Sequence, residues 1–218
     1  MSVRSALAIG LFGLATPALA GGVTGRVEVV QKGGRRLADL SDVVVYLEGA
    51  RERAQPTRTT ILMKGKAFLP RVAVVAVGST VEFPNQDPIF HNVFSVSGEN
   101  RFDLDLYKRP KSGSWTPQAP GVVRVYCNIH PQMNAIVLVR DNAHFTRAAR
   151  DGTFALAEVP AGRYTLKAWY ERAGEVSRPV VVPVQGEARA DLLLDASGYK
   201  RVSHKRKDGS SYGPGEKY

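Results

Sequence analysis

Residues 122–139 read VVRVYCNIHPQMNAIVLV, two apolar runs on either side of a short polar loop. Val122–Tyr126 and Ala135–Val139 are rich in β-branched residues, the composition typical of strands. Residues 127–133 between them contain Asn and Pro, which favour turns. The stretch therefore predicts two strands joined by a tight loop.

The loop carries three side chains that can bind a metal. Cys127, His130 and Met133 form a Cys-x-x-His-x-x-Met run, and His91 lies upstream in the run HNVFS. One thiolate, two imidazoles and one thioether are the ligands of a blue-copper site, with a trigonal His₂Cys plane and a weak axial Met. We therefore expect one type 1 copper ion and a redox carrier, not a hydrolase or a nucleic-acid binder.

Other interpretations of these residues stay open at this point. Cys127 is the only cysteine, and a buried free Cys can act as a small hydrophobic residue. Met133 can likewise be an ordinary core residue. The same ligands can also serve a copper chaperone or sensor, and a structural envelope-associated sandwich is a third possibility.

The rest of the chain predicts an all-β fold, a sandwich or barrel, because short Val-, Ile-, Phe- and Tyr-rich runs alternate with Gly, Pro, Asn and Asp. No stretch after the first twenty residues keeps a helical apolar period. The other expected strands are Val23–Val30, Val43–Leu47, Thr59–Met63, Val72–Val77, Val81–Phe83, Asn92–Val96, Phe102–Leu106, Ser114–Thr116, Thr153–Leu156, Tyr164–Tyr170, Val180–Val184 and Ala190–Leu194.

Residues 1–20 have the pattern of a cleavable signal peptide. Arg4 gives a positive start, Ala6–Leu14 is an apolar run too short to span a bilayer, and Ala18-Leu19-Ala20 is a small-x-small cleavage site. Cleavage after Ala20 would release a periplasmic or secreted protein, and an uncleaved N-terminal anchor is the alternative. We expect no transmembrane segment in the mature chain.

The chain is basic, with a formal net charge of +10. A positive net charge favours binding to nucleic acid, to an anionic membrane or to an acidic protein. The predicted export of the chain argues against nucleic acid. Part of the excess lies in the polar C-terminal tail, residues 197–218, which lacks the apolar residues needed for a core. We expect this basic tail to be disordered.

The middle of the chain resembles the cupredoxin family of the amicyanin and plastocyanin kind. The run FLPRVAVVAVGSTVEFPN (68–85) matches the pattern that precedes the first His ligand in this family, and His91-Asn92-Val93 and the 127–133 loop follow in order. The resemblance covers about Thr57 to Val139. It implies a Greek-key cupredoxin domain over residues 57–140, of the kind labelled a methylamine-utilisation protein.

The resemblance also implies roles around the copper. Asn92 would hydrogen-bond to the backbone of the Cys loop and tie the two ligand segments together. His130 would expose its ring edge as the electron gate, while His91 lies deeper. A hydrophobic surface formed by Pro131, Ile89 and Pro88 would dock a redox partner, such as a c-type cytochrome or a quinoprotein dehydrogenase.

Several other residues carry weaker expectations. Asp87 is left out of the ligand set, because an oxygen donor suits a harder ion. His144 and His204 are expected to be ordinary surface residues. With four histidines in all, the chain cannot build the second copper centre of a copper oxidase or nitrite reductase, so we do not expect an enzyme.

The two flanks resemble a carboxypeptidase-regulatory-like, transthyretin-like β-sandwich. GGVTGRVEVV (21–30) and VVVYLEG (43–49) look like its first strands, and DGTFALAEVPAGRYTLKAW (151–169) looks like the rest. We expect residues 21–56 and 141–196 to form one split domain into which the central domain is inserted. The alternative is a tandem arrangement, in which Val23–Leu47 pairs with the central domain.

Overall fold

The computed structural model describes residues 21–200 and 204–213, and the predicted signal peptide lies outside this part of the chain. The fold is all-β, as expected, and consists of packed sheets with two single-turn 3₁₀ segments, η1 (Lys32–Gly34) and η2 (Gly98–Asn100). Within the described residues, no helix is long and apolar enough to cross a membrane.

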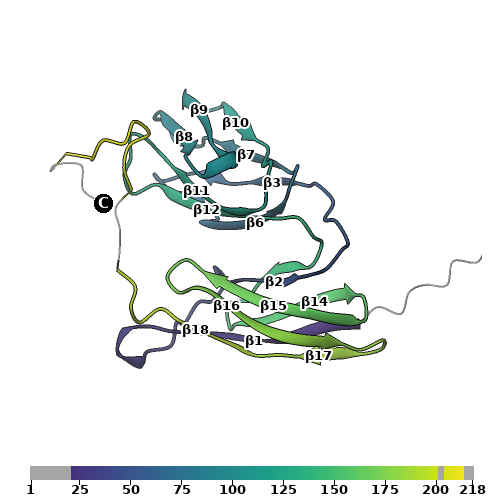
Figure 1. The fold of residues 1–218 in the computed structure, drawn as a ribbon. Coiled ribbons are helices and arrows are strands. Elements are labelled where there is room, and N and C mark those ends of the chain that lie inside the picture. Colours follow the sequence, from purple (N-terminus) through teal and green to yellow (C-terminus); the bar gives the residue numbers. More distant parts are fainter. Residues whose placement is uncertain (1–20, 201–203, 214–218) are drawn as a thin grey trace, which may run out of the picture.

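The central unit, residues 57–140, is a sandwich of two main sheets around one core (Figure 1). A five-stranded sheet has the order β6-β12-β11-β8-β9, and a three-stranded sheet has the order β10-β7-β3. The hairpin β4-β5 extends the second side. The bounds are β3 Arg58–Thr60, β4 Leu62–Met63, β5 Phe68–Leu69, β6 Val72–Ala76, β7 Thr80–Pro84, β8 His91–Ser95, β9 Phe102–Tyr107, β10 Ser112–Trp115, β11 Gly121–Tyr126 and β12 Asn134–Arg140.

The flanking unit, residues 21–56 and 141–196, is a second sandwich built from both ends of the chain. β1 pairs with β14, β17 and β18, and the other sheet has the order β13-β2-β15-β16. A separate apolar core fills the space between these sheets. The bounds are β1 Gly21–Val30, β2 Val44–Glu48, β13 Phe145–Arg147, β14 Thr153–Val159, β15 Gly162–Tyr170, β16 Gly174–Val182, β17 Glu187–Arg189 and β18 Leu192–Asp195.

Strand pairing bears on how the two units are connected. The N-terminal strands β1 and β2 pair with strands that follow the central unit, and their described residues form no ladder with β3 to β12. We propose on this pairing that the central unit is a domain inserted into a split flanking domain. Domain termini often lie close together, which makes such an insertion topologically simple.

The expected strand Ala190–Leu194 begins later than predicted: it corresponds to β18, which starts at Leu192, and an additional short strand, β17, ends at Arg189. Asp191 lies between these two strands, and its carboxylate accepts a hydrogen bond from the Arg26 backbone N–H at 2.8 Å. Nearby, the backbone carbonyl of Ala190 would lie 1.9 Å from a Cβ added at Gly25, so β1 approaches too closely for any side chain there. This side-chain contact and close approach accompany the break in the ladder.

The two units pack through an apolar seam, defined by Val44, Tyr46, Val72, Ile136, Leu138 and Trp169. Figure 1 shows β6 and β12 of the central unit facing β2 and β15 of the flanking unit. Successive residues of a strand point to opposite faces. On β12, Ile136 and Leu138 therefore enter the seam while Val137 and Val139 enter the central core. This double burial explains the continuous apolar run AIVLV.

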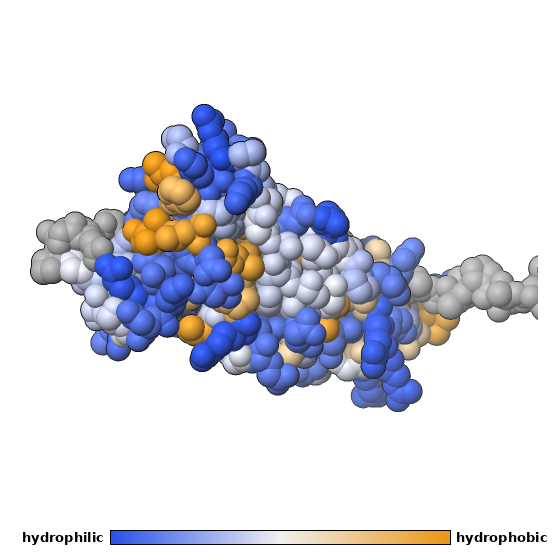
Figure 2. Space-filling model, turned by 90° about the horizontal axis from the view of Figure 1, so that it is seen from above, coloured by the Kyte–Doolittle hydropathy of each residue, from blue (hydrophilic) through white to orange (hydrophobic). Residues whose placement is uncertain are grey.

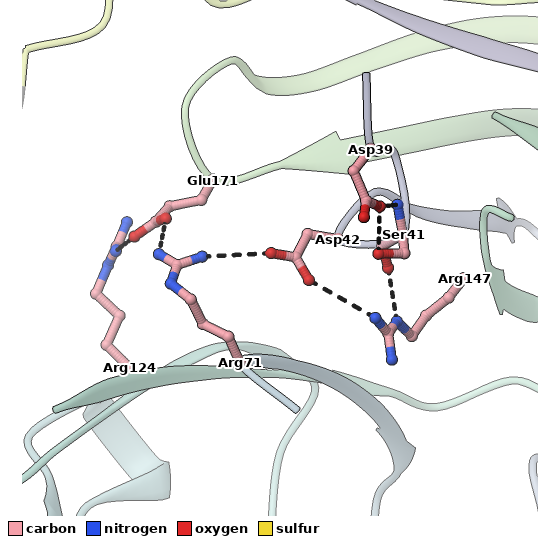
Figure 3. Close-up of polar contacts among 7 residues, drawn as sticks. All are labelled: Asp39, Ser41, Asp42, Arg71, Arg124, Arg147 and Glu171. Atoms are coloured by element: carbon pink, nitrogen blue, oxygen red, sulfur yellow. Dashed lines mark hydrogen bonds and ion pairs between the residues drawn. The ribbon is translucent and has the colours of Figure 1, made fainter. Parts of the chain in front are cut away.

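Ion pairs border the seam (Figure 3). Arg71 of the central unit pairs with Glu171 and lies 3.7 Å from Asp42, both in the flanking unit. Asp42 also lies 3.6 Å from Arg147, and Glu171 lies 3.5 Å from Arg124. These contacts join five sequence-distant segments at the junction of the units.

Candidate metal centre

The strands of the central unit bring the predicted ligands to one end of the sandwich. β11 lies between β12 and β8 and is antiparallel to β8, with Tyr126 paired to Phe94, so the residues that follow β11 run toward the start of β8. His91 is the first residue of β8 and Cys127 directly follows β11. Ligand atoms of His91, Cys127 and His130 all lie within 4.8 Å of one another.

The imidazoles converge on a common point through the same ring nitrogen. The Nδ1 atoms of His91 and His130 are 3.0 Å apart, and the Cys127 Sγ lies 3.7 Å from the His130 Nδ1. His91 is fully buried, whereas His130 is half-buried. Two imidazole nitrogens and one sulfur in this arrangement fit the trigonal plane of a blue-copper site.

Asp87 orients the His91 ring from the side away from the cluster. Its Oδ2 atom lies 2.8 Å from the His91 Nε2, which leaves Nδ1 directed toward Cys127 and His130. The same carboxylate accepts hydrogen bonds from the backbone N–H groups of Gly65 (2.7 Å) and Lys66 (2.9 Å). Burial opposes ionisation, but these bonds and His91 outweigh it and lower the pKa of Asp87.

Asp87 is excluded from the ligand set on sequence grounds, and no other role in the site is predicted for it. Its carboxylate holds a candidate ligand, a position typical of the partners that fix the orientation of metal-binding histidines. The spacing Asp-x-x-x-His is the only local signal. Residues four apart do not meet on an extended strand, so the contact depends on the turn that precedes β8.

Cys127 is fully buried, and its sulfur faces backbone amides. Burial raises the pKa of the Cys127 thiol, while hydrogen bonds from the backbone of Asn92, Ile129 and His130 act in the opposite direction. A metal binds the thiolate form. The three amides can stabilise the negative sulfur once a cation balances its charge.

His130 has the properties of a neutral ligand. Burial, followed by the proximity of His91 and Lys66, lowers the pKa of His130 below its usual range. The ring is therefore uncharged near neutral pH, which is the form that coordinates metals. Its partial exposure also agrees with the expected difference in depth between His130 and His91.

Met133 is fully buried and closes the loop. Its backbone N–H donates to the His130 carbonyl at 3.0 Å, and its own carbonyl accepts from the Cys127 N–H at 3.1 Å. These bonds make residues 127–133 a compact turn, as the sequence predicted. The role of Met133 as an axial ligand stays a prediction.

The Asn92 side chain does not make the expected hydrogen bond to the backbone of the Cys loop. Its side-chain amide donates to the Asp103 carboxylate at 2.7 Å and to the Asp105 carbonyl at 3.0 Å, both on β9. The pairing of β8 with β9 turns this side chain away from the Cys loop. The link to Cys127 comes instead from the Asn92 backbone amide.

Three further expectations need correction. Pro131 is buried, so it does not line a docking surface, whereas Pro88 and Ile89 are exposed as expected. His144 is also buried, and its Nε2 lies 3.3 Å from the Glu52 carboxylate. His204 is half-buried and stacks on Tyr126 at a centroid distance of 4.2 Å.

An apolar patch lies next to the candidate ligands. Ile89, Phe90 and Ile129 lie within two residues of His91 or His130 in the sequence and are 37%, 49% and 37% exposed. The Lys108 ammonium lies 5.3 Å from the centre of the Phe90 ring. Figure 2 shows hydrophobic residues gathered over the central unit and bordered by hydrophilic ones. Phe90 was missed from the sequence, although an aromatic residue beside a ligand is a usable signal.

No protein-family model and no curated protein matches this chain. Solved structures similar to it include the Cu-containing nitrite reductase of Thermus scotoductus SA-01, at 28% identity and a TM-score of 0.37, over 40% of this chain and 23% of that one. A purple cupredoxin from Nitrosopumilus maritimus matches at 21% identity and a TM-score of 0.34, over 38% of this chain and 99% of that one. A variant of amicyanin in its Cu(I) form matches at 24% identity and a TM-score of 0.36, over 38% of this chain and 82% of that one.

These likenesses have defined limits. The chain spans about a quarter of the nitrite reductase it matches, and the matches cover less than half of this chain. Because each TM-score lies below 0.5, the likenesses carry no conclusion about fold or function. The all-β sandwich fold and the His-Cys-His cluster are established by the strands and side chains of the chain itself.

Proposed function

We propose that this protein is an exported type 1 copper protein that carries single electrons between redox partners. One observation carries the proposal: His91, His130 and Cys127 direct two imidazole nitrogens and a sulfur at a common point at the end of a β-sandwich. A donor set of this softness suits copper better than a hard cation such as Mg²⁺ or Ca²⁺.

Each residue has a defined part in this proposal. His91, Cys127 and His130 would hold the ion, and Met133 would supply a fourth, weaker ligand. Bound copper would supply one-electron exchange between its Cu(I) and Cu(II) states. Asp87 fixes the His91 ring, and the backbone amides around Cys127 favour the thiolate. The half-exposed His130 is the route for the electron.

The proposed partner is an acidic redox protein, such as a c-type cytochrome or a quinoprotein dehydrogenase. Ile89, Phe90 and Ile129 offer a small apolar contact beside His130, which suits a brief encounter. Exposed cations on the β4–β5 and β9–β10 turns have no ion pair among the described residues and would speed association. These cations are Lys64, Lys66, Lys108, Arg109 and Lys111.

The remaining assignments belong to the same proposal. Residues 57–140 are a cupredoxin domain, of the kind labelled methylamine-utilisation protein, within a split carboxypeptidase-regulatory-like domain (residues 21–56 and 141–196). Residues 1–20 are a cleavable signal peptide that sends the protein to the periplasm or outside the cell. The proposed role is that of a carrier and not an enzyme, because four histidines in all are too few for a second copper centre; among the described residues, neither His144 nor His204 belongs to the His91–Cys127–His130 cluster.

The test is the visible spectrum of the chain from Gly21 onward after addition of Cu(II). We expect an intense blue band from charge transfer between thiolate and copper, which bleaches with a reductant and returns on reoxidation. Cys127→Ser should abolish the band. His144→Asn, which removes a buried histidine outside the cluster, should retain it.

Two results would contradict the proposal. The first is a protein that binds Cu(I) or Zn(II) without colour, which would favour a chaperone or sensor. The second is a blue band that survives Cys127→Ser, which would place the copper elsewhere.

A further inference from the structure

Part of the C-terminal tail folds against the candidate metal centre, although the sequence predicted a disordered tail. Residues 204–213 form a tight turn in which the Arg206 N–H donates to the Ser210 carbonyl at 2.9 Å. Gly209 has a φ of 86°, and the Asp208 carboxylate accepts from both the N–H and the Oγ of Ser210. Asp-Gly is a strong turn signal, so this turn was readable from the sequence. We call residues 204–213 the strap.

The two arms of the strap meet on the segment that carries Cys127. The Tyr212 hydroxyl donates to the Cys127 carbonyl at 3.1 Å, and the same oxygen lies 3.0 Å from the His204 Nε2. The His204 ring stacks on the Tyr126 ring, with centroids 4.2 Å apart and an interplanar angle of 17°. The side chains that make these contacts, His204 and Tyr212, are half-buried.

The tip of the strap makes a second attachment. The Lys207 N–H donates to the Asn128 side-chain oxygen at 2.9 Å, inside the Cys-x-x-His loop. The Lys207 ammonium lies 2.5 Å from the Asp103 carboxylate on β9. Asp103 also accepts the Asn92 amide, so the tip is linked to the residue beside His91.

The opposite charges of Lys207 and Asp103 favour the attachment of the strap tip to β9. The bond to Asp103 raises the pKa of Lys207. Burial would raise the pKa of Asp103, but the bonds from Lys207 and Asn92 lower it. Both groups therefore stay charged across the neutral range, and the contact joins opposite charges.

We infer that the strap is part of the metal centre and that Tyr212 and Lys207 are positioning residues for the Cys127 loop. The inference rests on the proposed function and extends it. Tyr212 fixes the Cys127 carbonyl and Lys207 fixes the next residue, so the strap restrains the backbone that aims the sulfur. Partners of this kind around metal ligands commonly change metal affinity by about 10–100-fold.

The strap also limits which face can exchange electrons. It occupies the side formed by Tyr126, Asn128 and β9. Ile89, Phe90 and Ile129 remain exposed with the strap in place. The strap therefore closes one approach to the sulfur and leaves the His130 face for a partner.

The experiment compares the full chain from Gly21 with three variants: a chain ending at Lys200, Tyr212→Phe and Lys207→Ala. Lys205→Ala is the matched control, because Lys205 is an exposed strap lysine with no ion pair or hydrogen bond among the described residues. The measurements are the rate of copper loss to a chelator, the reduction potential, the energy of the blue band, and hydrogen exchange of residues 127–133 in the metal-free protein.

We expect the truncated chain and Tyr212→Phe to lose copper about tenfold faster or more, with a shifted potential and blue band. Lys207→Ala should show the same effects, and Lys205→Ala should behave like the full chain. Hydrogen exchange in the loop should rise in the first three variants. Tyr212→Phe keeps the aromatic ring, so its effect isolates the hydroxyl contact.

Unchanged rates, potentials and exchange in the truncated chain would overturn the inference. If the full chain forms no blue site, the proposed function fails, and hydrogen exchange of the metal-free loop still decides whether the strap restrains it. The two failures are therefore distinguishable.

Discussion

Asp87 connects the candidate ligand His91 to the turn between β4 and β5. Its carboxylate contacts the His91 Nε2 and the backbone amides of Gly65 and Lys66. A buried carboxylate beside a ligand increases the electron density at the ring and favours the more highly charged state of the metal. The residue therefore influences both ring orientation and redox chemistry.

This arrangement predicts the effect of Asp87→Asn. The amide has one acceptor oxygen, so it can keep only one of the two backbone hydrogen bonds, and the negative charge is lost. Cu(II) affinity should therefore fall by about 10–100-fold and the reduction potential should rise. Competition titration and voltammetry measure the two quantities. Asp141→Asn, at an exposed position, is the control. A lower potential in Asp87→Asn would contradict the assigned role.

The position of some site residues could be predicted from the sequence, whereas the position of others could not. Cys127, His130 and Met133 lie within seven residues, so their spacing alone predicts a common loop. The contact of Asp87 with Gly65 depends on a tertiary approach across 22 positions and leaves no local pattern. Pro131 looked like a surface residue beside a half-exposed histidine, and only its packing shows that it is buried.

At the scale of elements, a polar cluster joins β2, β15 and β16. The Tyr46 hydroxyl donates to the Glu175 carboxylate, and the Lys167 ammonium lies 2.9 Å from the same group. Burial would raise the pKa of Glu175, but Tyr46 and Lys167 lower it. A group whose pKa is lowered by folding stabilises the protein above its unfolded pKa, and this contribution disappears as the pH falls through the folded value.

Glu175→Gln should therefore reduce the loss of stability on acidification below the ordinary range of a glutamate pKa. The side chain is 38% exposed, so solvent screening limits the effect to about 1 kcal/mol or less. Denaturant unfolding at pH 7 and near pH 3 measures it. Glu99→Gln, at an exposed position, should keep the acid sensitivity of the parent. An equal acid sensitivity in Glu175→Gln would contradict the assignment.

The elements themselves were largely predictable, because strands leave a local signal. Expected and observed strands agree closely at Val23–Val30, Ala135–Val139 and Tyr164–Tyr170. The short strand β17 and the start of β18 at Leu192 were not expected. The gap between these strands contains a hydrogen bond from the Arg26 backbone to the Asp191 carboxylate, 165 positions away.

At the scale of the molecule, the seam determines whether the two units behave as one. Trp169 is 7% exposed and packs in the seam with Val44 and Leu138. A buried apolar contact of this kind, bordered by the ion pairs of Arg71, couples the unfolding of the two sandwiches. The copper-loaded protein should therefore unfold in a single transition.

Trp169→Ala should destabilise the protein by about 3–5 kcal/mol and separate the transitions of the two units. Calorimetry reports both transitions, and loss of the blue band reports the central unit alone. Leu106→Ala, at a position 55% exposed, should change stability by less than about 0.5 kcal/mol. One unchanged transition in Trp169→Ala would show that the seam does not couple the units.

The all-β class and the candidate ligands of the Cys loop were predictable from the sequence alone, because alternating apolar residues and the Cys-x-x-His-x-x-Met spacing are local patterns. The tertiary structure decided the pairing of both flanks into one sandwich, the seam, the role of Asp87 and the contact of the strap with the Cys loop. These features arise from residues far apart in the chain, such as Lys207 and Asp103. Their meeting depends on how sheets stack, which no short stretch of sequence specifies.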